Sequence, residues 1–144
     1  MGKSADIIFM ATSRSGLGHI RRTASIALAL KARRPDLSIA LFTNAPVQGL
    51  PEGDMAAFDE TVIAERAQMI GLAGARQPLI IVADTMAPEG VAKSPATCVL
   101  ILREMPQDRL ARLALPGGVP WELVLVPNPR SHWMPELDDA FARN

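Results

Sequence analysis

Short continuous apolar runs are the feature that most limits how this chain can fold. Five runs have the length of a β-strand, and each is apolar at consecutive positions instead of alternating with polar residues. They lie at residues 7–11, 39–42, 79–83, 98–102 and 123–126. A strand that is apolar on both faces needs helices on both sides of its sheet. We therefore expect an α/β fold, a three-layer Rossmann-like domain whose mainly parallel sheet has five or six strands.

Segments with helical character separate these runs. They lie at residues 20–33, at about 59–72, around 89–93, and at 107–115, so that the predicted order is βαβαβαβαβ. The first helix is the clearest, because Ile20, Ala24, Ala27 and Leu28 form an apolar stripe at helical spacing. Pro35 prevents its continuation.

The stretch of residues 45–60 is rich in Gly and Pro and reads as a loop, with one helical turn at residues 55–58. A brief strand at residues 61–63 is an alternative reading of the segment that follows. We assign the domain to residues 1–127. Residues 128–144 form a Pro-containing tail. Its Trp133, Met134, Leu137 and Phe141 are either apolar anchors of a docking segment or pack back on their own domain, and both readings stay open.

Composition excludes several classes of function. A chain of 144 residues with 49% hydrophobic residues suits one domain with a real core. The net charge of +0 provides no global attraction for nucleic acid, so we predict no nucleic-acid partner. No apolar stretch reaches the roughly 20 residues of a transmembrane segment, and we predict none.

The cysteine and histidine content bears on the cellular location and on metal binding. The single cysteine, Cys98, lies in an apolar run and is expected to be a buried core thiol, which fits a reducing, cytoplasmic location. Two histidines and one cysteine form no recognisable ligand spacing, and we predict no metal site.

A glycine turn follows the first apolar run. Residues 13–22 read S-R-S-G-L-G-H-I-R-R, and they connect that run to the first helix. Gly16 and Gly18 permit backbone angles that other residues avoid, and the helix start presents unpaired N–H groups with a partial positive charge. This turn, including Ser15, predicts a site for a phosphate, diphosphate or carboxylate.

Charged residues near the turn fit such an anion. Arg14 lies in the turn, and Arg21 and Arg22 fall in the first helical turn, where cations are unfavourable without an anion nearby. Arginines also lie harmlessly on solvated helix faces, and that reading stays open. His19 has three candidate roles, as general base, as contact to an anionic ligand, or as a helix cap.

Polar residues at the ends of the later apolar runs are expected to join this site. In an open parallel sheet, ligands bind beyond the carboxyl ends of the strands. Asp84 follows the third run, and Arg103 and Glu104 follow the fourth. We predict that all three line the same rim as the glycine turn, although turn and cap residues are equally common at such positions.

Other phosphate motifs fit the turn poorly. The dinucleotide fingerprint requires a third glycine where this chain has Arg21, and the P-loop requires a Gly-Lys-Ser/Thr ending that is absent. We therefore predict neither a nicotinamide cofactor nor P-loop chemistry.

The string G-L-G-H-I-R-R-T-A-S-I-A-L-A-L at residues 16–30, followed by a second run ending T-N-A-P, resembles the N-terminal half of GT-B glycosyltransferases. It is similar in particular to predicted glycosyltransferases related to the MurG type. The segments L-I-L-R-E-M-P at residues 100–106 and L-V-L-V-P at residues 123–127 also look like later strands of that family. The resemblance covers roughly residues 6–127 and is most specific at residues 16–30.

The resemblance implies a single half of a GT-B fold, the Rossmann-like domain that holds the acceptor. In such enzymes the donor nucleotide sugar binds chiefly to a second Rossmann-like domain, and transfer occurs between the two. By this analogy Gly16, Gly18 and His19 would line the cleft near the phosphates or the acceptor hydroxyl. The chain shows no counterpart of the donor motif after Leu123, so we expect no cofactor to bind it alone, with a nucleotide sugar present only through a partner domain.

Three functions follow from this reading. The first is the acceptor-binding subunit of a split glycosyltransferase-like assembly, inactive without a second Rossmann-like chain or a second copy, whose ligand is a phosphorylated or glycosyl-acceptor small molecule. The second is a noncatalytic binding or scaffold protein derived from such a half-domain. The third is a small stand-alone enzyme acting on a phosphorylated compound through His19 with Asp84 or Glu104, closed by the loop at residues 45–60.

Overall fold

The fold is an open parallel sheet with helices on both faces. A computed structural model describes residues 4–14, 16–88, 95–103, 105–114, 118–127 and 141. The described strands are β1 (Ile7–Ala11), β2 (Ile39–Thr43), β3 (Glu60–Ile63), β4 (Ile80–Asp84), β5 (Thr97–Ile101) and β6 (Trp121–Leu125). All their pairings are parallel, and the order across the sheet is β3-β2-β1-β4-β5-β6. The expected three-layer, Rossmann-like α/β fold is confirmed.

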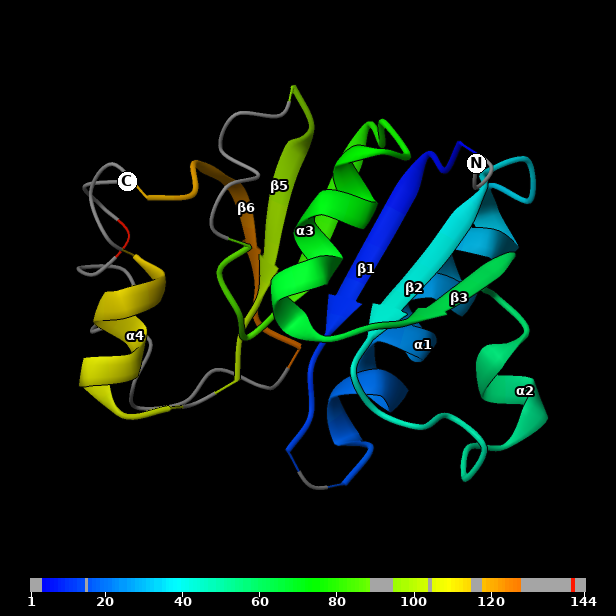
Figure 1. Cartoon of the computed structure of the whole chain (residues 1–144), viewed down its shortest axis with the longest axis horizontal. Coiled ribbons are helices and arrows are strands. Elements are labelled where there is room, and N and C mark those ends of the chain that lie inside the picture. Colours follow the sequence, from blue (N-terminus) through cyan, green and yellow to red (C-terminus); the bar gives the residue numbers. More distant parts are fainter. Residues whose placement is uncertain are drawn as a thin grey trace.

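The described helices are α1 (Gly18–Arg33), α2 (Glu52–Met55), α3 (Arg66–Gly74) and α4 (Gln107–Leu113). Figure 1 shows α3 in front of the sheet, α1 behind it and α2 at the lower right, with the carboxyl ends of the strands at the lower edge. Met55 of α2 packs against the same core cluster as Ile20 of α1. The helix predicted around residues 89–93 and the tail at residues 128–144, apart from Phe141, lie outside the described residues.

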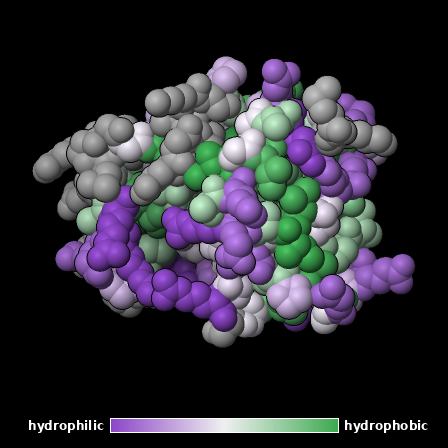
Figure 2. Space-filling model, viewed as in Figure 1, coloured by the Kyte–Doolittle hydropathy of each residue, from purple (hydrophilic) through white to green (hydrophobic). Residues whose placement is uncertain are grey.

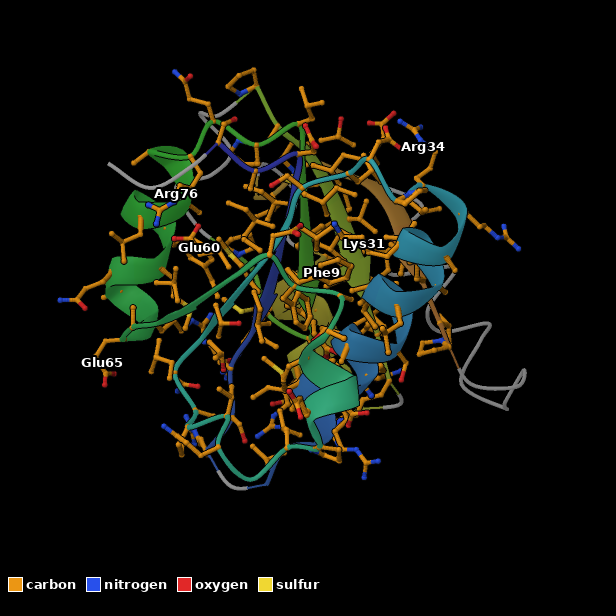
Figure 3. All side chains as sticks on the ribbon, turned by 90° about the vertical axis from the view of Figure 1, so that its right-hand side faces the viewer. Phe9, Lys31, Arg34, Glu60, Glu65 and Arg76 are labelled. Atoms are coloured by element: carbon orange, nitrogen blue, oxygen red, sulfur yellow. The ribbon has the colours of Figure 1, made fainter. Side chains whose placement is uncertain are left out.

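Alternate residues of each central strand serve the two faces of the sheet. On one face, Ile8 and Met10 of β1 pack in a core cluster with Met69 and Ala73 of α3. On the other face, Phe9 packs in a second core cluster that includes Ile20 of α1. Both faces of β1 are thus buried, which is why its sequence is apolar at every position. Figure 3 shows Phe9 in the interior of the molecule.

The helix expected at residues 59–72 is wrong in its first half. Residues 60–63 form the edge strand β3, paired in parallel with β2, and the helix begins only at Arg66. Three consecutive β-branched residues, Thr61, Val62 and Ile63, favour the strand. The alternative reading of a brief strand there is the correct one.

The first helix keeps its predicted stripe with one exception. Ile20, Ala24 and Ala27 are buried, whereas Leu28 is 37% exposed. Thr23 takes the remaining place on the buried face, where its hydroxyl donates to the Ile20 carbonyl at 2.8 Å. That bond explains how a polar side chain is accommodated in the core.

Cys98 is buried in the sheet, as expected, and desolvation raises the pKa of its thiol. No helix among the described residues is long and apolar enough to cross a membrane.

Candidate functional site

A cleft of about 780 Å³ opens at the carboxyl edge of the sheet. It lies at the point where the chain leaves β1 toward one side of the sheet and β4 toward the other, which is where open α/β sheets bind ligands. Most of its lining residues follow a strand or belong to the helix after one. They are Thr12, Ser13, Arg14, His19, Asn44, Arg66, Thr85, Met86, Ala87, Arg103, Met105, Pro106, Arg109, Arg112 and Leu113.

The glycine turn forms one side of this cleft. Gly16 has a φ of +81°, a left-handed conformation that glycine adopts without strain. Ser13 fixes the turn on both sides, since its N–H donates to Asn44 Oδ1 at 2.8 Å and its hydroxyl donates to the Gly16 carbonyl. Among the described residues, no side chain caps the start of α1 at Gly18, and the first turn of the helix contains no acidic residue. Its positive end is therefore left for another anion.

His19 is held by a buried carboxylate at the end of the neighbouring strand. Its Nδ1 lies 2.8 Å from Asp84 Oδ1, and the Asp84 side chain is fully buried. The strand register explains the contact, because Asp84 is the direct partner of Ala11, the last residue of β1. The two residues are 65 positions apart in sequence, and the adjacency of β1 and β4 brings them together.

The neighbours of Nδ1 determine where the imidazole carries its proton. Arg22 Nη2 lies 3.0 Å from Nδ1 and Thr85 Oγ1 lies 3.1 Å from it, but the Asp84 oxygen is nearest. A carboxylate only accepts hydrogen bonds and is the nearest neighbour, so we assign the proton to Nδ1; in this tautomer Arg22 Nη2 makes no hydrogen bond to the ring. In the neutral ring Nε2 is then the acceptor, and His19 lines the cleft. This arrangement suits a general base.

Arg22 neutralises the same carboxylate. Its Nε donates to Asp84 Oδ2 at 2.8 Å and its Nη2 donates to Oδ1 at 2.5 Å, a two-pronged contact. Burial by itself would raise the pKa of Asp84, but hydrogen bonds from His19 and Arg22 hold it below the usual range. Asp84 is therefore ionised at neutral pH.

Thr85 continues the site in an unusual backbone conformation. Its φ is +51°, in the left-handed region that residues other than glycine rarely adopt. Its N–H donates to the Ile101 carbonyl at 2.8 Å, and its hydroxyl donates to Asp84 Oδ1 at 3.2 Å. Non-glycine residues in this conformation concentrate at functional sites.

Arginines dominate the charge of the cleft. Among the described residues that line it, five are arginines and none is acidic. No salt bridge joins any of the five to a carboxylate of the described part of the chain. In Figure 2 strongly hydrophilic residues gather at the lower left, over α4 and beside a hollow of the surface. The cleft is thus suited to an anionic ligand.

The structure brings together only part of the predicted site. Arg14, His19 and Arg103 line the cleft, and Asp84 lies beneath His19. Gly16 and Gly18 belong to the turn beside it. Ser15 and Glu104 lie outside the described residues.

The two arginines of the first helical turn have other partners. Arg22 is committed to Asp84, so it acts on the site through that carboxylate. Arg21 is not a lining residue, and its Nε donates to Asp54 Oδ2 of α2 at 3.2 Å. Of the two, only Arg22 adjoins the candidate site.

Sequence reasoning missed several cleft residues. Arg66 begins α3, and Arg109 and Arg112 lie on α4. A helix that follows a strand in a parallel sheet begins at the carboxyl edge, so the positions of Arg66 and Arg109 near the helix starts were an available signal, whereas Arg112 lies in the last turn of α4. Their convergence depends on the order of the strands, which the sequence does not reveal.

Comparison of the chain with protein-family models, with curated proteins and with solved structures finds no match.

Proposed function

We propose that the protein is the acceptor-binding subunit of a split glycosyltransferase-like assembly. Its cleft holds a phosphorylated acceptor against the glycine turn, and a partner chain supplies the nucleotide-sugar domain. The observation that carries the proposal is the hydrogen bond between His19 Nδ1 and Asp84 beside an arginine-lined cleft. The sequence resemblance to the acceptor side of GT-B enzymes is strongest at residues 16–30, which include His19.

The chemistry assigned to this site is deprotonation of an acceptor hydroxyl. His19 Nε2 takes the proton while the hydroxyl oxygen forms a bond to the anomeric carbon of the donor sugar, and the nucleoside diphosphate leaves with the electron pair of the broken bond. Asp84 fixes the imidazole tautomer and stabilises the cation that forms. Arg22 keeps that carboxylate ionised.

A stand-alone enzyme is the alternative that the His19–Asp84 pair also supports. That reading needs a segment to close the cleft, and we expected only residues 45–60 to be long enough. In the structure this segment packs behind the sheet, where Ala45, Ala57 and Phe58 belong to the same core cluster as Phe9. None of residues 45–60 lines the cleft. This packing favours closure of the cleft by a partner chain over closure by residues 45–60.

The test compares the purified chain with the native complex isolated from its own cells. Each is incubated with a panel of nucleotide sugars and a phosphorylated acceptor extract, and release of nucleoside diphosphate is measured. We expect release only from the complex, and we expect His19→Ala to abolish it. Arg33→Ala is the matched control, because Arg33 is an exposed residue at the far end of α1.

Three other outcomes would contradict the proposal. Release by the isolated, homogeneous chain would assign the activity to a stand-alone enzyme. A complex that binds phosphorylated ligand but releases nothing would assign a noncatalytic binding role. Full activity of the His19→Ala complex would remove the general base from the mechanism.

A further inference from the structure

We infer that the cleft contains a second anionic subsite, so that its ligand carries two separated anionic groups. We call the subsite the arginine wall and define it as Arg103, Arg109 and Arg112. The inference deepens the proposed function and rests on it, because it assumes that the first anionic group binds at the glycine turn. It assigns the ligand to the class of small molecules with a phosphate at one end and a second phosphate or a carboxylate further along.

The topology separates the arginine wall from the glycine turn. Its three arginines follow β5, either directly after the strand or on α4, whereas the glycine turn follows β1. β4 lies between β1 and β5 in the sheet. Neighbouring strands lie about 4.8 Å apart, so the two strand ends are separated by roughly 10 Å. One phosphate group does not bridge that distance.

The composition of the wall points to an anion. Arg109 and Arg112 are three positions apart on one short helix, so both occupy the same side of it. All three guanidinium groups belong to exposed residues, and none forms a salt bridge with a described carboxylate. Like charges gathered in this way repel one another, and an anionic ligand would remove that repulsion.

Several other described arginines are paired with carboxylates of the protein, whereas Arg14 and Arg33 form no salt bridge with a described carboxylate. Arg22, Arg34 and Arg76 each make a two-pronged contact to a carboxylate. A guanidinium has a planar set of donors that matches carboxylate and phosphate oxygens. The arginine wall presents the same donors to the cleft without a described protein acceptor.

The test uses two probes that differ by one charged end. Hexyl phosphate carries one phosphate, and 1,6-hexanediol bisphosphate carries a second at a distance comparable to the strand-end separation. Dissociation constants are measured by calorimetry at low and physiological salt for the wild-type chain, for the double variant Arg109→Ala, Arg112→Ala, and for the control Arg33→Ala. A Gly18→Val variant reports on the glycine turn.

We expect the bisphosphate to bind the wild-type chain at least about tenfold more tightly than the monophosphate, since one added charge-assisted contact contributes about 1.5–3 kcal/mol. The double variant should lose that advantage while keeping its affinity for hexyl phosphate within about twofold. Alanine is a good helix former, so the exposed positions 109 and 112 should tolerate it. Arg33→Ala should change neither affinity.

The outcomes separate the two proposals. Binding of hexyl phosphate that Gly18→Val abolishes, with no added affinity for the bisphosphate, would overturn the arginine wall and leave the proposed function standing. An unchanged bisphosphate advantage in the double variant would do the same. Absence of binding for both probes would overturn the proposed function and this inference together.

Discussion

Replacing Asp84 with asparagine tests the buried centre of the site. The Asp84 side chain is fully buried and accepts hydrogen bonds from His19, Arg22 and Thr85. An asparagine side chain would keep one acceptor oxygen but would place an NH₂ group against donors and leave the Arg22 charge without its counter-ion. Breaking a buried ion pair costs about 3–5 kcal/mol.

The expected loss is smaller than that range because the partners are only partly buried. The side chains of His19 and Arg22 remain 23% and 21% exposed, so water compensates part of the loss. We expect Asp84→Asn to lower the free energy of unfolding by about 2–4 kcal/mol, and the unfolding temperature by roughly 6–16 °C. The assay is urea and thermal unfolding followed by circular dichroism. Asp36→Asn, which breaks an exposed pair with Arg34, is the control and should leave the unfolding temperature unchanged.

The pH dependence gives the same prediction an independent check. The pKa of Asp84 is lowered in the folded state, so its stabilising contribution is present above the unfolded-state pKa of about 3.9 and is lost as the pH falls through the folded value. The stability difference between wild type and Asp84→Asn should therefore shrink as the pH falls below about 4. A variant within about 0.5 kcal/mol of wild type at pH 7 would refute the reasoning.

Three further predictions concern the turn, the β3 edge and the core. Gly16→Ala should lower the free energy of unfolding by about 1–2 kcal/mol, because the φ of +81° is strained for alanine. Gly18→Ala should leave it nearly unchanged, because an added Cβ meets no atom within 4 Å. Chemical denaturation of both variants measures the difference. Arg76→Ala should lower the free energy of unfolding by about 1–2 kcal/mol, because the largely buried Arg76 pairs with Glu60 (Figure 3). Its Cζ also lies 5.7 Å from the centroid of the Phe42 ring. An Arg76→Ala variant as stable as Arg34→Ala would contradict this. Cys98 should react slowly with a thiol reagent at pH 8 in the folded protein and fully in the protein unfolded by guanidinium, because burial raises the pKa of its thiol. Fast reaction in the folded protein would show that the thiol is accessible.

The sequence by itself determined the class of fold. Runs such as residues 7–11 and 39–42 are apolar at every position, and only a sheet covered on both faces buries them. It also located the turn at Gly16 and the first helix, because a glycine pair, an apolar stripe and a proline are local signals. Residues 59–72 were misread because β-branched residues and a helical pattern competed within one short segment.

Only the tertiary structure decided which side chains meet at the site. The order β3-β2-β1-β4-β5-β6 places Asp84 beside Ala11 and beneath His19, although these residues are far apart in the chain. It also commits Arg22 to Asp84 while Arg109 and Arg112 line the cleft. Apolar patterning reports burial, and burial is compatible with many strand orders. Pairing of charges depends on distance, which the packed sheet alone establishes.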